Sequence, residues 1–311
     1  MQNLKEYSRT RLFNQAVQGE HNFFEPVSGR EEYLSRWEHF RPEVESQIEE
    51  LLEEAARLPK ATGQRWDHAR PVTIGIIADE FLFESLEAAA NFVPITPDNY
   101  LEKIPHLDLL LVVSTWRGLN GEWRTVTQPK SKLRKLLEQQ LIPFAKERGV
   151  PVAFYSKEDP PNFDTFLSIA AGADYIFTSA EEVIPKYRAA LGDEVRIEPL
   201  RFAVNYRLHN PLGCTRHTGK EMVFAGSWMA PKYKERAKAA EKIFDGVIES
   251  GVPLYIFDRN LELDPAQFKN ADKYLYPEKY LPNLHKPVPH KEVLKLQKLL
   301  PLAVNLNSVV G

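Results

Sequence analysis

From residue 71 onward the chain alternates short, almost uninterrupted apolar runs with longer stretches of helical character, and this alternation constrains the fold most strongly. Five apolar runs come first, at residues 73–79, 108–114, 151–156, 174–179 and 195–200. Strands that are apolar throughout must be covered on both faces of their sheet. Because helices are expected between them, notably over residues 130–148 and 180–191, the pattern predicts a doubly wound parallel sheet.

The same alternation resumes after a stretch without periodicity. Residues 201–220 are rich in Asn, Pro and Gly and are interpreted as a linker. Strands are then expected at residues 221–228, 253–259 and 302–308, with helices over 232–250 and 291–299. This second α/β domain is expected to be incomplete, since about 90 residues follow the linker and a typical domain has about 150.

The first seventy residues differ from the rest and predict helix. Apolar side chains recur at helical spacing between residues 44 and 58, with carboxylates on the opposite face. We expect this helix to dock on a core, because a partner-binding coiled coil would need a longer repeat. Tyr33, Trp37 and Phe40 are expected to extend the docking face. The predicted division is therefore a helical extension (1–70), a first domain (71–200), a linker (201–220) and a partial second domain (221–311).

Charge and cysteine content exclude several classes of protein. The 311 residues include 40 Lys and Arg against 43 Asp and Glu, so no general basic field exists to bind nucleic acid. The single cysteine, Cys214, cannot form an internal disulfide, and we expect a cytoplasmic protein. No apolar run is long enough to cross a bilayer, so any membrane contact would be peripheral. The sequence has no G-x-G-x-x-G, no P-loop and no H-E-x-x-H, and we expect no metal site.

Polar clusters follow the predicted strands of the first domain, at the edge where open α/β sheets bind ligands. The candidate residues are Asp79 and Glu80; Trp116, Arg117, Asn120 and Trp123; and Lys157, Glu158 and Asp159. Indole faces stack on sugar rings or bases, and a guanidinium binds phosphate or carboxylate. The alternative for the W-R-G-x-N-G-E-W segment is a packed turn whose tryptophans fill the core. For K-E-D-P, either carboxylate could act as a general base, and the alternative is a solvated ion-pair loop.

Three clusters follow strands of the second domain. Gly226 and Ser227 lie at a strand-to-helix turn, where free backbone N–H groups favour a phosphate; a tight turn beside a solvated basic face is the alternative. Asp258 and Arg259 end the next predicted strand and could contact a ribose, a base or a phosphate. Asn305 and Asn307 end the last one, where polar residues interrupt an apolar run.

Taken in order, these segments resemble those of the spore maturation protein CgeB-like glycosyltransferases. The resemblance runs from about residue 71 to the end and rests on IADEF, ITPDN, STWRGLNGEWR, SKEDPPNFDTF, DYIFTSAEEVIPKY, LHNP, FAGSW, YIFDRN and VNLNS. It implies a GT-B architecture, in which two Rossmann-like domains respectively receive the acceptor and an activated nucleotide sugar. The absence of an Asp-x-Asp motif fits this expectation, because metal-dependent GT-A enzymes commonly use that motif.

The resemblance implies transfer of a sugar from a nucleotide sugar, with a UDP-sugar the expected donor, to a surface-polysaccharide, spore-coat or related hydroxyl acceptor. No cofactor beyond that co-substrate is expected. Asp159 or Glu158 is the candidate base; Asp79, Glu80, Lys157 and the W-R-G-x-N-G-E-W residues would form the acceptor side. The second-domain clusters would bind the donor. Two alternatives stay open: a noncatalytic nucleotide- or sugar-binding protein of the same fold, and a nucleotide-sugar epimerase.

Overall fold

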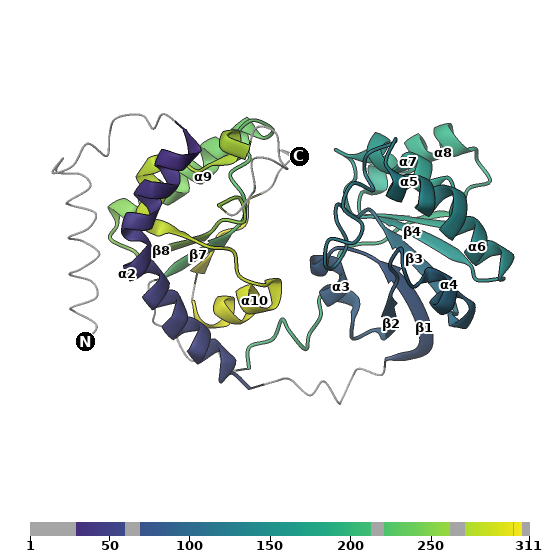
Figure 1. The fold of residues 1–311 in the computed structure, drawn as a ribbon, viewed down its shortest axis with the longest axis horizontal. Helices are drawn as coiled ribbons and strands as arrows, with labels where there is room; N and C mark the ends of the chain where they lie inside the picture. Colours follow the sequence, from purple (N-terminus) through teal and green to yellow (C-terminus); the bar gives the residue numbers. More distant parts are fainter. Residues whose placement is uncertain (1–28, 60–68, 213–220, 262–270, 301, 307–311) are drawn as a thin grey trace. The chain divides into compact units, whose positions relative to one another are not determined.

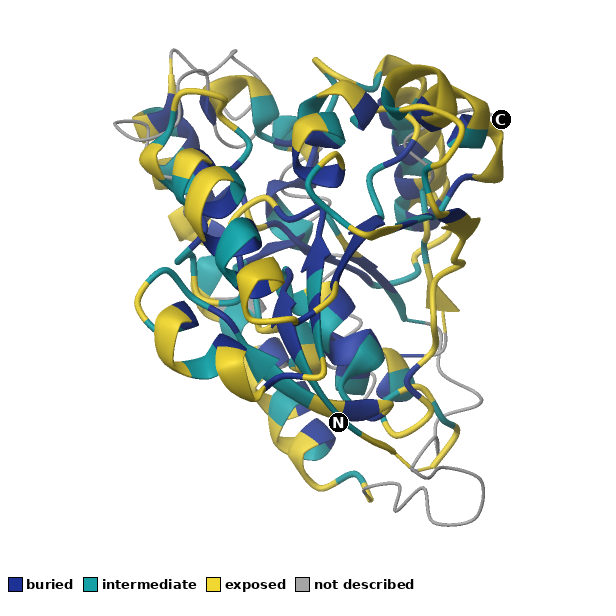
Figure 2. Ribbon diagram, turned by 90° about the vertical axis from the view of Figure 1, so that its right-hand side faces the viewer, coloured by how far each residue is buried: buried dark blue, intermediate teal, exposed yellow. Residues whose placement is uncertain are grey.

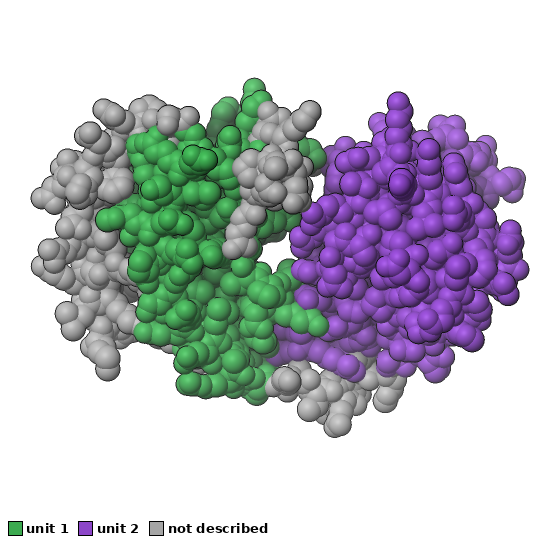
Figure 3. Space-filling view, in the orientation of Figure 1, with its two compact units in different colours: residues 1–60, 211–311 green, residues 61–210 purple. Residues whose placement is uncertain are grey.

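A computed structural model describes residues 29–59, 69–212, 221–261, 271–300 and 302–306 (Figure 1). Cys214 and Asn307, both singled out above, lie outside these residues. The chain divides into two compact units, coloured separately in Figure 3. Residues 61–210 form one, here called the central unit. Residues 1–60 and 211–311 form the other, here called the discontinuous unit.

The central unit is built on a six-stranded parallel sheet of order β2-β1-β3-β4-β5-β6. Its strands are β1 (Arg70–Ile77), β2 (Ala90–Pro94), β3 (Leu109–Val113), β4 (Val152–Ser156), β5 (Tyr175–Thr178) and β6 (Ile197–Pro199). Its helices are α3 (Glu80–Leu86), α4 (Tyr100–Lys103), η1 (Ile104–His106), α5 (Lys132–Leu136), η2 (Leu137–Leu141), α6 (Ile142–Glu147), α7 (Phe163–Ala170), η3 (Glu181–Val183) and α8 (Ile184–Leu191).

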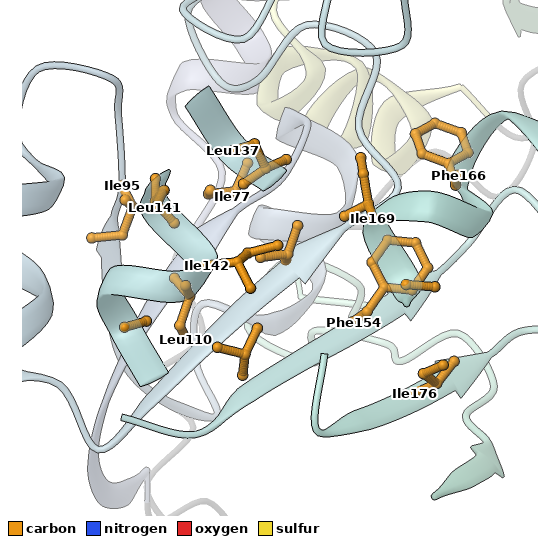
Figure 4. Close-up of a cluster of buried hydrophobic side chains, with 14 of the residues drawn as sticks. Ile77, Ile95, Leu110, Leu137, Leu141, Ile142, Phe154, Phe166, Ile169 and Ile176 are labelled. Atoms are coloured by element: carbon orange, nitrogen blue, oxygen red, sulfur yellow. The ribbon is translucent and has the colours of Figure 1, made fainter. Parts of the chain in front are cut away.

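Alternate side chains of these strands enter two apolar clusters, one on each face of the sheet. On the face with the larger cluster, strand residues such as Leu110 and Phe154 pack against helical residues (Figure 4). These are Leu141 of η2, Ile142 of α6 and Ile169 of α7. The opposite face packs against α3. Strand β4 is accordingly buried along its whole length, while the helices expose their outer sides (Figure 2). The predicted doubly wound parallel sheet is confirmed for this unit.

The discontinuous unit has a four-stranded parallel sheet of order β10-β7-β8-β9. Its strands are β7 (Met222–Ala225), β8 (Leu254–Phe257), β9 (Leu284–His285) and β10 (Leu302–Ala303). Its helices are α2 (Arg30–Ala56), α9 (Lys234–Glu249), η4 (Ala271–Tyr274), η5 (Glu278–Asn283) and α10 (His290–Leu299).

Helix α2 is part of this unit, which corrects the division that set residues 1–70 apart as an extension. Tyr33, Trp37 and Phe40 from its first half enter the apolar cluster on the α9 face of the sheet. Ile48, Leu51 and Ala55 from its second half enter the cluster on the α10 face. The Trp37 indole also donates to the Leu284 carbonyl of edge strand β9 at 3.0 Å. The helix therefore covers an edge strand that would otherwise expose unpaired backbone groups.

Two further boundaries differ from the predictions. The residues up to Asn210, assigned above to a linker, belong to the central unit, because Asn205 is buried and donates to the Glu84 carbonyl of α3 at 2.7 Å. Strands β2 and β9 were not predicted. Both are short edge strands, and Pro and Asn in β2 and the surrounding prolines of β9 hide the strand pattern.

Candidate functional site

The order of strands in the central unit reverses between β1 and β3, and the carboxyl ends of these two strands meet there. Asp79 follows β1 and holds the loop that follows β3. Its Oδ1 accepts hydrogen bonds from the Thr115 hydroxyl at 2.5 Å and from the N–H groups of Arg117 and Gly118 at 3.1 and 3.0 Å. Its Oδ2 accepts from the Trp116 N–H at 3.0 Å. The carboxylate of Asp79 is thus occupied in shaping the loop.

The loop held by Asp79 also depends on a glycine. Gly118 has φ +79°, in the left-handed region that favours glycine. A Cβ atom there would lie 2.9 Å from the ring of Trp123. Any larger residue at position 118 would therefore be strained in its backbone and would displace a core side chain.

A second charged group lies beside Asp79, after β4. Lys157 forms ion pairs with Asp79, at 3.6 Å, and with Glu158. The other oxygen of Glu158 accepts from Asn162 at 2.9 Å. The Lys157 N–H donates to the Ser114 hydroxyl at 2.9 Å, which ties the ends of β3 and β4 together. The structure therefore brings Asp79, Lys157 and Glu158 into one network.

An exposed group borders this network. Trp116 is 40% exposed and its ring meets that of Phe166 edge-on at 5.7 Å. The Arg117 guanidinium lies 4.0 Å from the Glu80 carboxylate, and both side chains are about half exposed. Asn120 is exposed and its backbone N–H donates to Glu122. These side chains can contact a ligand from solution.

Two candidates of the central unit lie inside it. Trp123 is completely buried in the apolar cluster and donates to the Ile95 carbonyl at 2.8 Å, so it has the packing role that was the alternative to acceptor binding. Asp159 is also buried, and its Oδ2 accepts from Thr178 and Tyr187 at 2.7 and 3.1 Å. Burial raises the pKa of Asp159, and these hydrogen bonds oppose the rise. Of the two proposed bases, Glu158 is the more accessible.

In the discontinuous unit the order of strands reverses between β7 and β10. Arg236, in the first turn of α9, spans this point: its Nη1 donates to the Ser227 carbonyl at 3.0 Å and its Nε to the Leu306 carbonyl at 3.3 Å. Arg259 follows β8 and donates from Nε to the Ser227 hydroxyl at 2.8 Å. The Gly226 carbonyl accepts from Tyr276. Two guanidinium groups therefore converge on the Gly226–Ser227 turn.

The two arginines differ in exposure. Arg236 is partly buried, and burial lowers the pKa of its guanidinium from the usual value. Arg259 is exposed, as is Asn305 beyond β10. Cationic groups at the carboxyl edge of a parallel sheet can hold an anionic ligand such as a diphosphate.

Asp258 lies inside this unit, with no exposed surface. Its Oδ1 accepts from the Asn260 N–H at 2.9 Å. Burial raises its pKa to about 7, and Arg259 and Arg30 partly offset that rise. Sequence analysis did not select Arg30, which starts α2. The only sequence signal for Arg30 is its position three residues before Tyr33. This spacing places the two side chains on one face of a helix.

Within the described residues no group of three or more His, Cys, Asp or Glu side chains could hold a metal ion. No helix in those residues combines the length and apolar character that crossing a bilayer requires. No family model, curated protein or solved structure matches the chain.

Proposed function

We propose that the chain is a glycosyltransferase that takes its sugar from a nucleotide sugar, with the two units acting as the acceptor and donor domains of a GT-B enzyme. The observation that carries this proposal is the pair of guanidinium groups at the β7/β10 reversal. Arg236 donates hydrogen bonds to the Ser227 carbonyl after β7 and to the Leu306 carbonyl after β10. Arg259 donates to the Ser227 hydroxyl. Open parallel sheets bind nucleotides at such reversal points, and two cations there suit a diphosphate.

The chemistry divides between the units. A hydroxyl oxygen of the acceptor attacks the anomeric carbon of the donor sugar, and the bond from that carbon to the diphosphate oxygen breaks. The hydroxyl proton goes to a general base, and the nucleoside diphosphate leaves with the bonding electrons. Arg236 and Arg259 would stabilise the charge that develops on the leaving diphosphate. A UDP-sugar is the proposed donor.

The exposed side chains at the β1/β3 reversal would bind the acceptor. Trp116 offers a partly exposed indole face for a sugar ring, and Arg117 and Glu80 offer hydrogen bonds to hydroxyl groups. Glu158 is the proposed base, because Asp159 is buried and already holds Thr178 and Tyr187.

The test is release of nucleoside diphosphate from a panel of UDP-, GDP-, ADP- and CDP-sugars, with and without glycan acceptors. We expect turnover with one donor class, and Arg259→Gln should raise the KM for that donor by about tenfold or more, since a hydrogen bond to a charged group contributes about 1.5–3 kcal/mol. Arg57→Gln, at the exposed end of α2, is the matched control and should change nothing. Unchanged kinetics in Arg259→Gln would remove this residue from the donor site.

A second function, nucleotide-sugar binding without transfer, is favoured by one observation. Both candidate carboxylates are engaged: Asp159 by Thr178 and Tyr187, and Glu158 by Lys157 and Asn162. Calorimetry separates the two functions, because tight donor binding with no turnover on any acceptor would support the binding protein. Loss of transfer in Glu158→Gln with unchanged donor affinity would support the enzyme.

A further inference from the structure

Three buried polar atoms near the end of β8 have no hydrogen-bond partner among the described residues. They are Nη1 of Arg30, the hydroxyl of Tyr33 and Oδ2 of Asp258. All three side chains are more than nine-tenths buried. A buried polar group without a partner is costly, so each such group needs an explanation, and a partner bound from solution is one.

Two of these atoms belong to side chains that are anchored on the same residue. Asp258 accepts the Asn260 N–H through Oδ1, at 2.9 Å. Arg30 donates through Nη2 to the carbonyls of Asn260 and Leu261, at 2.7 and 3.0 Å. In each side chain one terminal atom is hydrogen-bonded to the backbone. The other terminal atom, Oδ2 of Asp258 or Nη1 of Arg30, has no partner among the described residues. An acceptor, Oδ2, and a donor, Nη1, thus belong to side chains that are anchored on the backbone of the same residue, Asn260.

The third atom comes from the same helix as Arg30. Tyr33 lies three residues further along α2, on the same face, and its ring is fixed in the apolar cluster of the α9 face. Burial raises the pKa of its hydroxyl most, and Asp258 and Arg30 also shift it, so both charges lie within electrostatic range of Tyr33. The set therefore offers two donors, from Arg30 and Tyr33, and one acceptor, from Asp258.

We propose that Arg30, Asp258 and Tyr33 bind the uracil base of the donor nucleotide. This inference rests on the proposed function and specifies how its donor site selects a nucleotide. Uracil presents two carbonyl oxygens, O2 and O4, on either side of the N3–H group. The N3–H would donate to the ionised carboxylate of Asp258, and the two carbonyls would accept from Arg30 and Tyr33.

The other bases match this set less well. Cytosine and adenine carry a lone pair where uracil carries the N3–H group, so the Asp258 carboxylate would face an acceptor. Guanine presents one carbonyl beside two N–H donors, so only one of the two protein donors would find a partner. A site built to hydrogen-bond a ligand discriminates strongly against an analogue that leaves its buried groups unpaired.

The position of the set agrees with the rest of the donor site. Arg259, proposed above to contact the diphosphate, is the residue directly after Asp258. Base and diphosphate would thus be bound by consecutive residues at the end of β8. Because the three atoms have no contact with solvent, the base must displace the side chains that bury them, and we expect association to be slow.

The experiment is calorimetry on the full chain with UDP, GDP, CDP and ADP at pH 8, above the Asp258 pKa of about 7, so that this carboxyl group is ionised. We expect UDP to bind at least about tenfold more tightly than each of the others, as the loss of one hydrogen bond to a charged group implies. Equal affinity for all four nucleotides would overturn the proposal that this site recognises the base. The proposed function would be unaffected by that result. Preference for GDP, CDP or ADP would overturn the uracil assignment. Binding of none would overturn the proposed function together with this inference.

Substitutions test which of the three side chains recognise the base. Tyr33→Phe removes only a hydroxyl that has no partner among the described residues, so the protein should stay folded while UDP affinity falls about threefold to tenfold. Asp258→Asn should lower the ratio of UDP affinity to CDP affinity, because an amide can donate a hydrogen bond to the cytosine ring nitrogen. Arg36→Gln on α2, whose ion pairs are with Glu32 and Glu278, is the control and should leave that ratio unchanged. An unchanged ratio and affinity in both Tyr33→Phe and Asp258→Asn would overturn the proposal.

Discussion

At the scale of single residues, Asp79 shows how a side chain selected from sequence for binding can serve to shape the site. Its position after a buried strand correctly predicted that it would lie at the carboxyl edge of the sheet. Its hydrogen bonds to the Thr115 hydroxyl and to the N–H groups of residues 116–118 depend on the loop after β3, which sequence does not place. The carboxylate fixes the backbone that presents Trp116 and Arg117.

We expect Asp79→Asn to destabilise the central unit by about 2–4 kcal/mol, because an amide cannot accept this whole set of hydrogen bonds and leaves N–H groups unpaired. Urea unfolding followed by tryptophan fluorescence measures the loss. Asp98→Asn, an exposed aspartate of the same unit, should change stability by less than about 0.5 kcal/mol. Equal stability of the two variants would contradict the role given to Asp79.

Substitution of Tyr33 is expected to change stability in the opposite direction from Asp79→Asn. Its buried hydroxyl has no partner among the described residues. Removing such a group while keeping the ring should stabilise the nucleotide-free protein, by about 1 kcal/mol. Thermal unfolding of Tyr33→Phe measures this, and a clear loss of stability would show that the hydroxyl is hydrogen-bonded in solution.

Asp258 gives the discontinuous unit a predictable dependence on pH. Its pKa is raised from 3.8 to about 7 by burial, so the folded protein holds a proton that the unfolded chain has lost. Stability is therefore greatest below about pH 4 for this group and falls as pH rises to about 7, by up to about 4 kcal/mol. Asp258→Asn should remove this fall, which urea unfolding at pH 5 and pH 8 measures. A variant with the same pH dependence as the parent would contradict the assignment.

At the scale of elements, α2 carries two results that its sequence only partly predicted. The helical spacing of its apolar residues correctly indicated a docked helix. Its partner could not be predicted, because the residues with which it shares its clusters lie more than 160 positions later in the chain. Packing across both faces of the four-stranded sheet makes the helix part of that unit.

Trp37 is the residue that tests this packing. It is buried and hydrogen-bonded to edge strand β9, so Trp37→Ala should cost about 3–5 kcal/mol by leaving a cavity and an unpaired carbonyl. Circular dichroism during urea unfolding measures the loss. Arg57→Ala, whose ion pair at the end of the helix is exposed, is the control and should be nearly neutral. A neutral Trp37→Ala would contradict the docking of α2.

At the scale of the whole molecule, the apolar clusters respect the division into units. Each of the four described clusters draws its residues from one unit alone. The discontinuous unit needs both ends of the chain, since two of its clusters include residues of α2.

Two fragments should therefore behave differently. Residues 61–210 expressed alone should fold and unfold cooperatively, because their sheet and clusters are complete in themselves. Residues 211–311 alone should not fold, and adding a peptide of residues 29–60 should restore structure. Circular dichroism and amide NMR dispersion measure both outcomes. A folded 211–311 fragment would show that α2 is dispensable.

The sequence by itself determined the class of fold and the edge at which polar residues gather. Apolar runs separated by helices allow little except a covered parallel sheet, and residues that follow a strand must lie at its carboxyl end. The tertiary structure alone decided which of those residues are accessible. Trp123, Asp159 and Asp258 carry the same local signals as Trp116, Glu158 and Arg259, yet they lie inside. It also brought Arg30 and Tyr33 to Asp258, because contacts between distant segments arise from packing and leave no periodic pattern in the chain.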